Sequence, residues 1–402
     1  MGKPSSLPLQ DARNGSQWPA ILAVAWAGSN YFVIVSLQPM LLGSLTDNVY
    51  FTLGEASLAL SANMLGALIG NILAYFLLAR VSARTLIVVG AVGMSAFQLT
   101  AAVLPITPVH FAVLMLGTGW GTGLMGAAAW ATVSVMDRPT RVFAIMGAAL
   151  VITGAVAIYL APHVIAAFGL PGLMLGLAVS AALVLPTTPL FFEPGRPDKV
   201  QKRTTASNAS SRGSVMLLLS LAVLYVANNA TWAYLALIAE AAGLVGDQVG
   251  SAIAIGQLVS VVGSVLAARF EGSRSRPAIA IALLLLVIST TALMFGHNVV
   301  AMTVIVAGIM GAVSFAVPLY LADLVFFDSS GRLVVWGQLA IGIGLMLGPP
   351  AASFWVDFTS LNTMIWTAGG VYLLSLALAA LAFKLRPITA VPPPNSSLEQ
   401  PT

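Results

Sequence analysis

Apolar stretches of about 20 residues or more follow one another along almost the entire chain. Crossing the hydrocarbon core of a bilayer takes about 20 apolar residues in a helix, whereas barrel strands would alternate apolar and polar residues over about ten. Charged residues are only 7% of the sequence and apolar residues 59%, so lipid must be the main solvent. The sequence predicts an all-α membrane protein with twelve transmembrane helices, at residues 19–45, 55–78, 85–104, 110–136, 142–168, 172–192, 214–239, 249–268, 276–295, 299–322, 333–356 and 361–383.

The basic residues predict the orientation of these helices. With the N-terminus inside, all 17 Lys and Arg fall in the predicted cytoplasmic segments and none falls in the six outer loops. This distribution obeys the positive-inside rule, and one missed or added helix would disturb it downstream. We therefore expect both termini in the cytoplasm and a multi-pass location in a cell (inner) membrane.

One internal segment and two terminal segments interrupt the apolar pattern. Residues 193–213 are basic and rich in Ser, Thr, Pro and Gly, which predicts a flexible cytoplasmic linker. Residues 1–18 are predicted to be a cytoplasmic tail and residues 387–402 a disordered one. The remaining residues form two six-helix bundles, at 19–192 and 214–386.

The two predicted bundles resemble each other in sequence. Residues 76–90 are echoed by 264–280, with Arg80 corresponding to Arg269, and residues from 161 are echoed from 348, with Pro162 corresponding to Pro350. The two offsets are 189 and 188 residues, which favours duplication of a six-helix unit. Parallel repeats of this kind are one architecture of secondary transporters.

Three loop segments carry a resemblance to a known family. The basic loop 78–84 (LARVSAR), its copy 268–274 (ARFEGSR) and the stretch 167–174 (AFGLPGLM) are similar to those of the major facilitator superfamily. Ala79 and Ser82 depart from the pattern of the first loop, and Met115 replaces an Arg that many proton antiporters carry. The resemblance implies alternating access through a central cavity that the first and seventh helices line.

Charge is absent from the predicted middle of the membrane. All 13 acidic residues lie in loops, tails or the ends of helices, and no ionisable side chain other than Tyr lies at mid-depth. Ionisable groups inside a membrane are costly and are usually kept for function. Their absence argues against a cavity for a permanently charged substrate.

The polar residues that remain at mid-depth are neutral. Buried amides need partners, which are either the substrate or neighbouring helices, and for Asn30 and Asn229 the two interpretations are equally weighted. Small residues on the second helix, such as Gly66 and Gly70, instead indicate close helix packing. The candidate substrate-binding residues are Asn30, Tyr31, Trp120, Asn228, Asn229 and Trp232.

Charged residues near the helix ends are candidates for gating and coupling. Basic residues of the repeated loops (Arg80, Arg84, Arg269) are predicted to pair with Asp137 and Asp323 when the cytoplasmic side closes, although topology alone also explains basic loops there. Glu240 is the preferred candidate for proton coupling because it follows the polar part of the seventh helix. A facilitator without a coupled ion agrees equally well with the sequence.

Other classes of membrane protein find less support. The chain has no Cys and only three scattered His, so we expect no enzyme activity, cofactor or metal site. No nucleotide-binding loop or selectivity filter is recognisable. We expect a monomeric secondary transporter of a small neutral or amphiphilic organic solute, with lipid and a candidate coupling proton, but no nucleic acid, as partners. The alternatives are multidrug or metabolite efflux by proton antiport and an uncoupled facilitator.

Overall fold

The structure is a computed structural model that describes residues 18–48, 51–105, 107–133, 136, 139–191, 212–270, 274–327 and 332–385. Within these residues every regular element is a helix. The helices are α1 (Trp18–Asn48), α2 (Leu53–Leu77), α3 (Ala83–Val103), α4 (Pro108–Val133), α5 (Pro139–Ala182), η2 (Leu185–Leu190), α6 (Arg212–Ala233), α7 (Leu235–Ala241), α8 (Gly246–Leu258), α9 (Ser260–Ala267), α10 (Ser275–Ala292), η4 (Leu293–Phe295), α11 (Val299–Phe327), α12 (Arg332–Phe358) and α13 (Leu361–Lys384).

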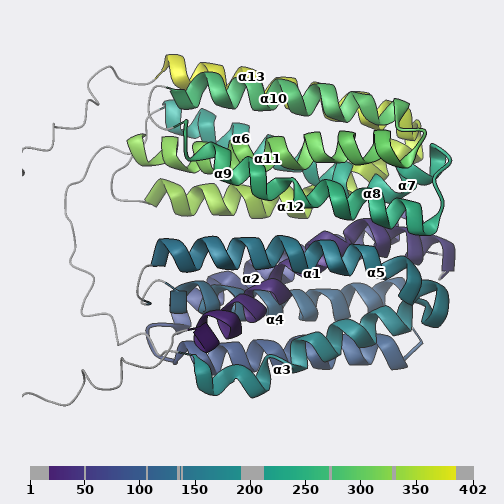
Figure 1. Ribbon diagram of the computed structural model, residues 1–402, viewed down its shortest axis with the longest axis vertical. Coiled ribbons are helices and arrows are strands. Elements are labelled where there is room, and N and C mark those ends of the chain that lie inside the picture. The colour runs from purple at the N-terminus through teal and green to yellow at the C-terminus, as the bar shows by residue number, and fades with distance from the viewer. Residues whose placement is uncertain are drawn as a thin grey trace, which may run out of the picture.

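Eleven segments of the described chain are long and apolar enough to cross a membrane, so this is a multi-pass membrane protein. One of them, Ile145–Leu190, has 46 residues, which at about 1.5 Å per residue is more than twice the thickness of the hydrocarbon core. It contains a break at Gly169, whose φ of 65° lies in the left-handed region that favours glycine. Figure 1 shows α5 running along the molecule and then turning back.

Two helix groups lie side by side in Figure 1, α1–α5 in purple to teal and α6–α13 in green to yellow. We call them the N-half and the C-half. They meet mainly along two pairs of helices, α2 with α12 and α5 with α8, and α1 also contacts α6 and α7. We name the two ends of the molecule after the ends of α1, the Trp18 end and the Asn48 end.

Glycines hold α4 tightly between α2 and α3. Gly119 and Gly123, one helical turn apart, face the backbone of α2 at Asn63 and Ala67, where any Cβ would collide with a carbonyl oxygen. Gly121 faces the backbone of α3 at Gly90 in the same way. The small residues that the sequence assigned to close packing therefore do pack backbone against backbone.

Two predicted helices are interrupted. The predicted helix 214–239 is divided into α6 and α7 at Tyr234, whose φ of −94° and ψ of 2° lie outside the helical region. The predicted helix 249–268 is likewise divided into α8 and α9 around Val259. In addition, α6 begins at Arg212, inside the predicted linker, and residues 193–211 of that linker lie outside the described residues.

Candidate functional site: the boundary between the halves

Among the residues that the structure describes, three side-chain hydrogen bonds join the N-half to the C-half. Trp232 Nε1 donates to the carbonyl oxygen of Val35 over 2.8 Å, and Gln257 Nε2 donates to Ser36 Oγ over 3.0 Å. The hydroxyls of Ser57 and Tyr234 are 2.8 Å apart. The first two lie near the middle of α1 and the third near the Asn48 end, so these bonds close the boundary from its middle to the Asn48 end.

The contact between Ser36 and Gln257 involves a third helix. A Cβ on Gly154 of α5 would collide with both Ser36 Oγ and Gln257 Nε2. Gly154 therefore leaves the space in which α1 and α8 form their hydrogen bond. Two turns further along α5, Pro162 packs against Gly250 of α8, so the contact between the halves extends toward the Asn48 end.

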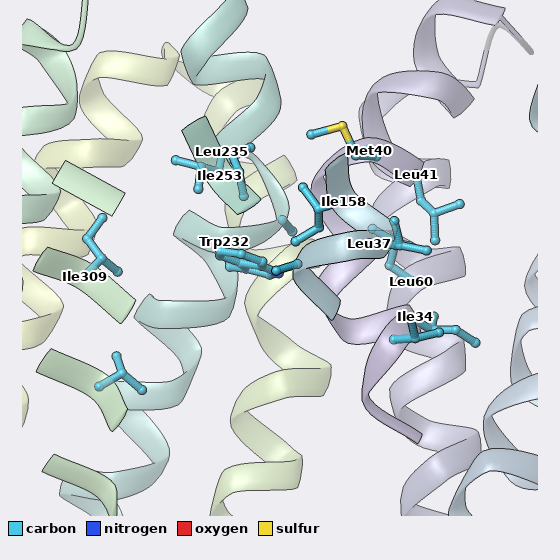
Figure 2. Packing of buried hydrophobic residues seen from close by; sticks show 14 of the residues in the cluster. Ile34, Leu37, Met40, Leu41, Leu60, Ile158, Trp232, Leu235, Ile253 and Ile309 are labelled. Carbon is cyan, nitrogen blue, oxygen red and sulfur yellow. The ribbon is translucent and has the colours of Figure 1, made fainter. Parts of the chain in front are cut away.

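Polar and aromatic residues of α1 and α6 face each other across this boundary. Tyr31 and Val35 lie one turn apart on α1, and Asn228 and Trp232 lie one turn apart on α6. Trp232 contacts Val35, and Figure 2 shows its ring at the boundary between the halves. Asn228 shares the face of Trp232, so the spacing places it toward α1 near the level of Tyr31.

Several buried amides around the boundary have groups without a hydrogen-bond partner. Both amide atoms of Gln38, which is 0% exposed, have no partner within the protein. The same holds for Asn228 Oδ1, Asn229 Oδ1 and Gln257 Oε1. Each such group costs about 1–3 kcal/mol until it is satisfied. Of these groups, the amide oxygens of Asn228 and Gln257 are neutral acceptors on helices that meet at the boundary, and a solute or water can use them.

The predicted substrate-binding residues do not all come together. The amide of Asn30 is paired within the N-half, donating to the carbonyl oxygen of Trp26 over 3.0 Å and accepting from Ser180 over 2.9 Å. The ring of Trp120 packs against Gly93 of α3. Trp232 lies at the boundary, where it contacts Val35, and Tyr31 of α1 lies near Tyr225 of α6. Helical spacing places Asn228 on the same face of α6 as Trp232.

Asn229 and Tyr31 each also contact residues of their own half. Asn229 Nδ2 donates to the carbonyl oxygen of Leu345 on α12. Tyr31 packs on Gly126 of α4, where a Cβ would meet its ring, and interacts with the side chain of Asn71. Both residues therefore connect a boundary helix to the rest of its own half.

The candidate gating residues that the structure describes lie at the Trp18 end. Arg80, Arg84 and Arg269 are exposed and form no ion pair with the described part of the chain. Asp323 is 1% exposed, and the Ser275 hydroxyl lies 3.0 Å from each of its carboxylate oxygens. Asp137 lies outside the described residues.

A cavity of about 290 Å³ opens between the halves at the Asn48 end. It is lined by α1, α5, α7 and α8, and two acidic residues, Asp47 and Glu240, lie on its wall. Partial burial, followed by repulsion from the carboxylate of Asp47, raises the pKa of Glu240 above its ordinary value. Glu240 thus binds a proton more readily than a free carboxylate does.

Of the residues that join the halves, the sequence singled out Trp232 as a candidate. Ser36, Gly154, Ser57, Tyr234 and Gln257 were not candidate site residues. Their helical spacing resembles that of ordinary packing residues, and only the relative rotation of the helices brings them together. Among the described residues, no group of three His, Asp or Glu side chains is placed to hold a metal ion.

Comparison with known proteins gives a consistent result. The chain resembles the crystal structures of the nucleoside transporter NupG in its D323A mutant (TM-score 0.73, 14% identity, covering 91% of this chain and 98% of that one) and of a D-xylose-proton symporter (TM-score 0.74, 14% identity, covering 92% and 98%). It also resembles a partially occluded inward open conformation of the xylose transporter XylE from E. coli (TM-score 0.67, 14% identity, covering 92% and 98%).

At this identity the structural likeness concerns the fold. No curated protein sequence matches the chain significantly. The family model of the Major Facilitator Superfamily matches twice, over residues 20–217 and 217–401. The two matches cover nearly all of the sequence and agree with the two helix groups, so the chain belongs to the major facilitator superfamily and is a membrane transporter rather than an enzyme.

Proposed function

We propose that this protein is a secondary transporter that moves a small, neutral or amphiphilic organic solute by alternating access between the N-half and the C-half. The observation that carries the proposal is the boundary itself, where the buried amide oxygens of Asn228 and Gln257 have no hydrogen-bond partner within the protein. Such oxygens accept hydrogen bonds from hydroxyl, amide or other donor groups of a solute. The acidic residues of the boundary, Asp47 and Glu240, lie at the Asn48 end, so a permanently charged solute would find no counter-charge among the described residues next to Asn228.

The proposed topology has twelve crossings and cytoplasmic termini in an inner cell membrane. The break at Gly169 supports counting the two limbs of α5 as separate crossings. The two family matches support bundles at residues 19–192 and 214–386. With this orientation the Trp18 end is cytoplasmic and the Asn48 end faces outward.

In that orientation the hydrogen bonds between the halves close the outer side, as expected of an inward-facing state. The exposed, unpaired Arg80, Arg84 and Arg269 agree with an inner side that is not locked. On outward opening, the Trp232 and Gln257 bonds break, and the basic loops approach Asp137 and Asp323. We propose a monomer, because each chain contains both halves of the boundary.

Proton coupling through Glu240 is the proposed energy source. Its position on the wall of the outer cavity exposes it to outside protons, and its raised pKa favours protonation there. An uncoupled facilitator and a proton-driven exporter are the alternatives. Coupled and uncoupled transport differ in a measurable way, since only coupled transport builds a solute gradient under an imposed pH difference.

Uptake into proteoliposomes tests this function. The panel consists of nucleosides, pentoses, neutral amino acids, neutral aromatic amides and organic anions, and it begins with nucleosides and D-xylose because those are the solutes named for similar structures. We expect saturable uptake of an uncharged solute that Asn228→Ala weakens. Transport confined to organic anions would contradict the neutral site.

A further inference from the structure

A cationic site lies between α10 and α13 at the Trp18 end, away from the boundary between the halves. The guanidinium carbon of Arg276 lies 5.6 Å from the centre of the Phe383 ring. Lys384 directly follows Phe383 and is exposed, and Arg274 is exposed at the start of α10. Since α10 packs against α13, these residues place up to three positive charges at one junction.

Arg276 differs from an ordinary solvent-exposed loop arginine. Its side chain is half-buried against the ring, and its Nε is buried without a hydrogen-bond partner. Leaving a charged donor unsatisfied is costly, so this group is suited to an anionic acceptor. The nearby carboxylate of Asp323 is buried, and the hydroxyl of Ser275 is directed to it.

The surface next to this cationic site is apolar. Ile281, Leu284 and Ile288 are 65%, 46% and 64% exposed and follow one face of α10. Leu374 and Leu381 are exposed on α13. This stripe begins five residues after Arg276, about 7.5 Å along the helix, and it continues toward the middle of the membrane.

The geometry points to a binding site for an anionic phospholipid at this junction, with its phosphate on Arg276 and Lys384 and its acyl chains along the α10–α13 stripe. Arg274 adds charge at the rim. A guanidinium and an ammonium match a phosphodiester, and the apolar stripe matches the chains of the same molecule. The assignment to the cytoplasmic leaflet rests on the proposed orientation, whereas the binding itself does not.

The test uses the purified full chain in mixed micelles with increasing fractions of phosphatidylglycerol, against phosphatidylcholine as the neutral lipid. The rise in melting temperature gives the midpoint of lipid binding. We expect each removed charge in Arg276→Gln and Lys384→Gln to weaken binding about fivefold. Arg276→Lys keeps the charge but loses the planar contact, so it should retain part of the binding and serves as the variant closest to the native fold.

Two controls decide whether the site is specific. Arg84→Gln removes one positive charge from the same end of the N-half and should leave the phosphatidylglycerol midpoint unchanged. Inorganic phosphate should not reproduce the stabilisation, because it lacks acyl chains. Unchanged lipid midpoints in Arg276→Gln/Lys384→Gln, an equal loss in Arg84→Gln, or full stabilisation by phosphate would each overturn the proposal. Because solute uptake is measured separately, these outcomes leave the transport proposal unaffected.

Discussion

Gln257 and Ser36 are 221 residues apart in the sequence, yet Nε2 of Gln257 donates a 3.0 Å hydrogen bond to Oγ of Ser36. This bond connects α8 in the C-half to α1 in the N-half, and Gly154 of α5 leaves the room for it. Under the proposed alternating access the two halves separate here, so the contact would report on which side is closed.

Replacing Gly154 by Ala should loosen this contact. The added Cβ collides with both bonded atoms, so we expect a loss of about 1–3 kcal/mol and a shift away from the state described here. Gly147 is on the same helix, and nothing lies within 4 Å of its Cβ position, so Gly147→Ala should stabilise the helix slightly. Thermal unfolding in detergent checks both variants, and equal melting temperatures would contradict the role of Gly154.

Asn30 of α1 and Asn228 of α6 should respond differently to truncation. Asn228→Ala should raise KM about three- to tenfold with little change in stability, because Asn228 Oδ1 has no partner within the protein. Asn30→Ala should lower the melting temperature, because it removes the bonds to Trp26 and Ser180. Uptake kinetics and unfolding on the same preparations separate the effects, and the reverse pattern would exchange the two roles.

Glu240→Gln should remove a pH dependence. Because the folded-state pKa of Glu240 is raised, the folded state binds more protons than the unfolded one between the ordinary and the raised pKa. The native protein should therefore lose stability as pH rises through this interval, and Glu240→Gln should lose less. Melting temperatures of both proteins across about pH 4–7 test this, because that range begins just below the ordinary pKa of Glu and extends above it.

The same substitution tests coupling. If Glu240 carries the proton, Glu240→Gln abolishes accumulation driven by a pH difference while solute exchange continues. Asp247→Asn is the matched control, since Asp247 is also acidic and exposed at the Asn48 end. Accumulation that continues unchanged in Glu240→Gln would remove Glu240 as the coupling residue and assign the proton to another group. Absence of accumulation in the native protein would instead leave the uncoupled facilitator.

Close packing of α4 predicts a strong effect on stability. Gly119→Ala places a methyl group against the carbonyl oxygen of Asn63, and backbone atoms cannot move aside as a flexible side chain would. We expect a loss of about 1–3 kcal/mol or more. Gly176→Ala, where nothing lies within 4 Å, should show no such loss in the same unfolding measurement.

The proposed gate predicts coupling between Arg80 and Asp137. If they pair when the cytoplasmic side closes, the transport defects of Arg80→Ala and Asp137→Ala should not add in the double variant. Arg84→Ala combined with Asp137→Ala measures how specific the pair is. Additive defects in both combinations would mean that the basic loops serve topology alone.

Sequence reasoning reached the class of the fold and the family but only part of the candidate site. Tyr31, Asn228 and Trp232 were recognised because polar residues within apolar helices are conspicuous. Asn30 is just as conspicuous, yet its amide is occupied by Trp26 and Ser180. Nothing in the spacing of Asn30 and Asn228 distinguishes a paired amide from an unpaired one, because the partners lie on other helices.

The sequence alone determined that this chain is an all-helical, multi-pass membrane protein, since the length of the apolar segments and the scarcity of charge follow directly from the bilayer as solvent. Its internal repeat and the resemblance of its loops to those of a transporter family added the expectation of transport. The tertiary structure alone decided that Ser36 meets Gln257, that Val35 meets Trp232 and that Asp47 and Glu240 share a cavity. Lipid-facing and protein-facing sides of these helices are both apolar, so hydrophobicity does not specify how each helix is rotated. That rotation follows from packing between residues far apart in the chain.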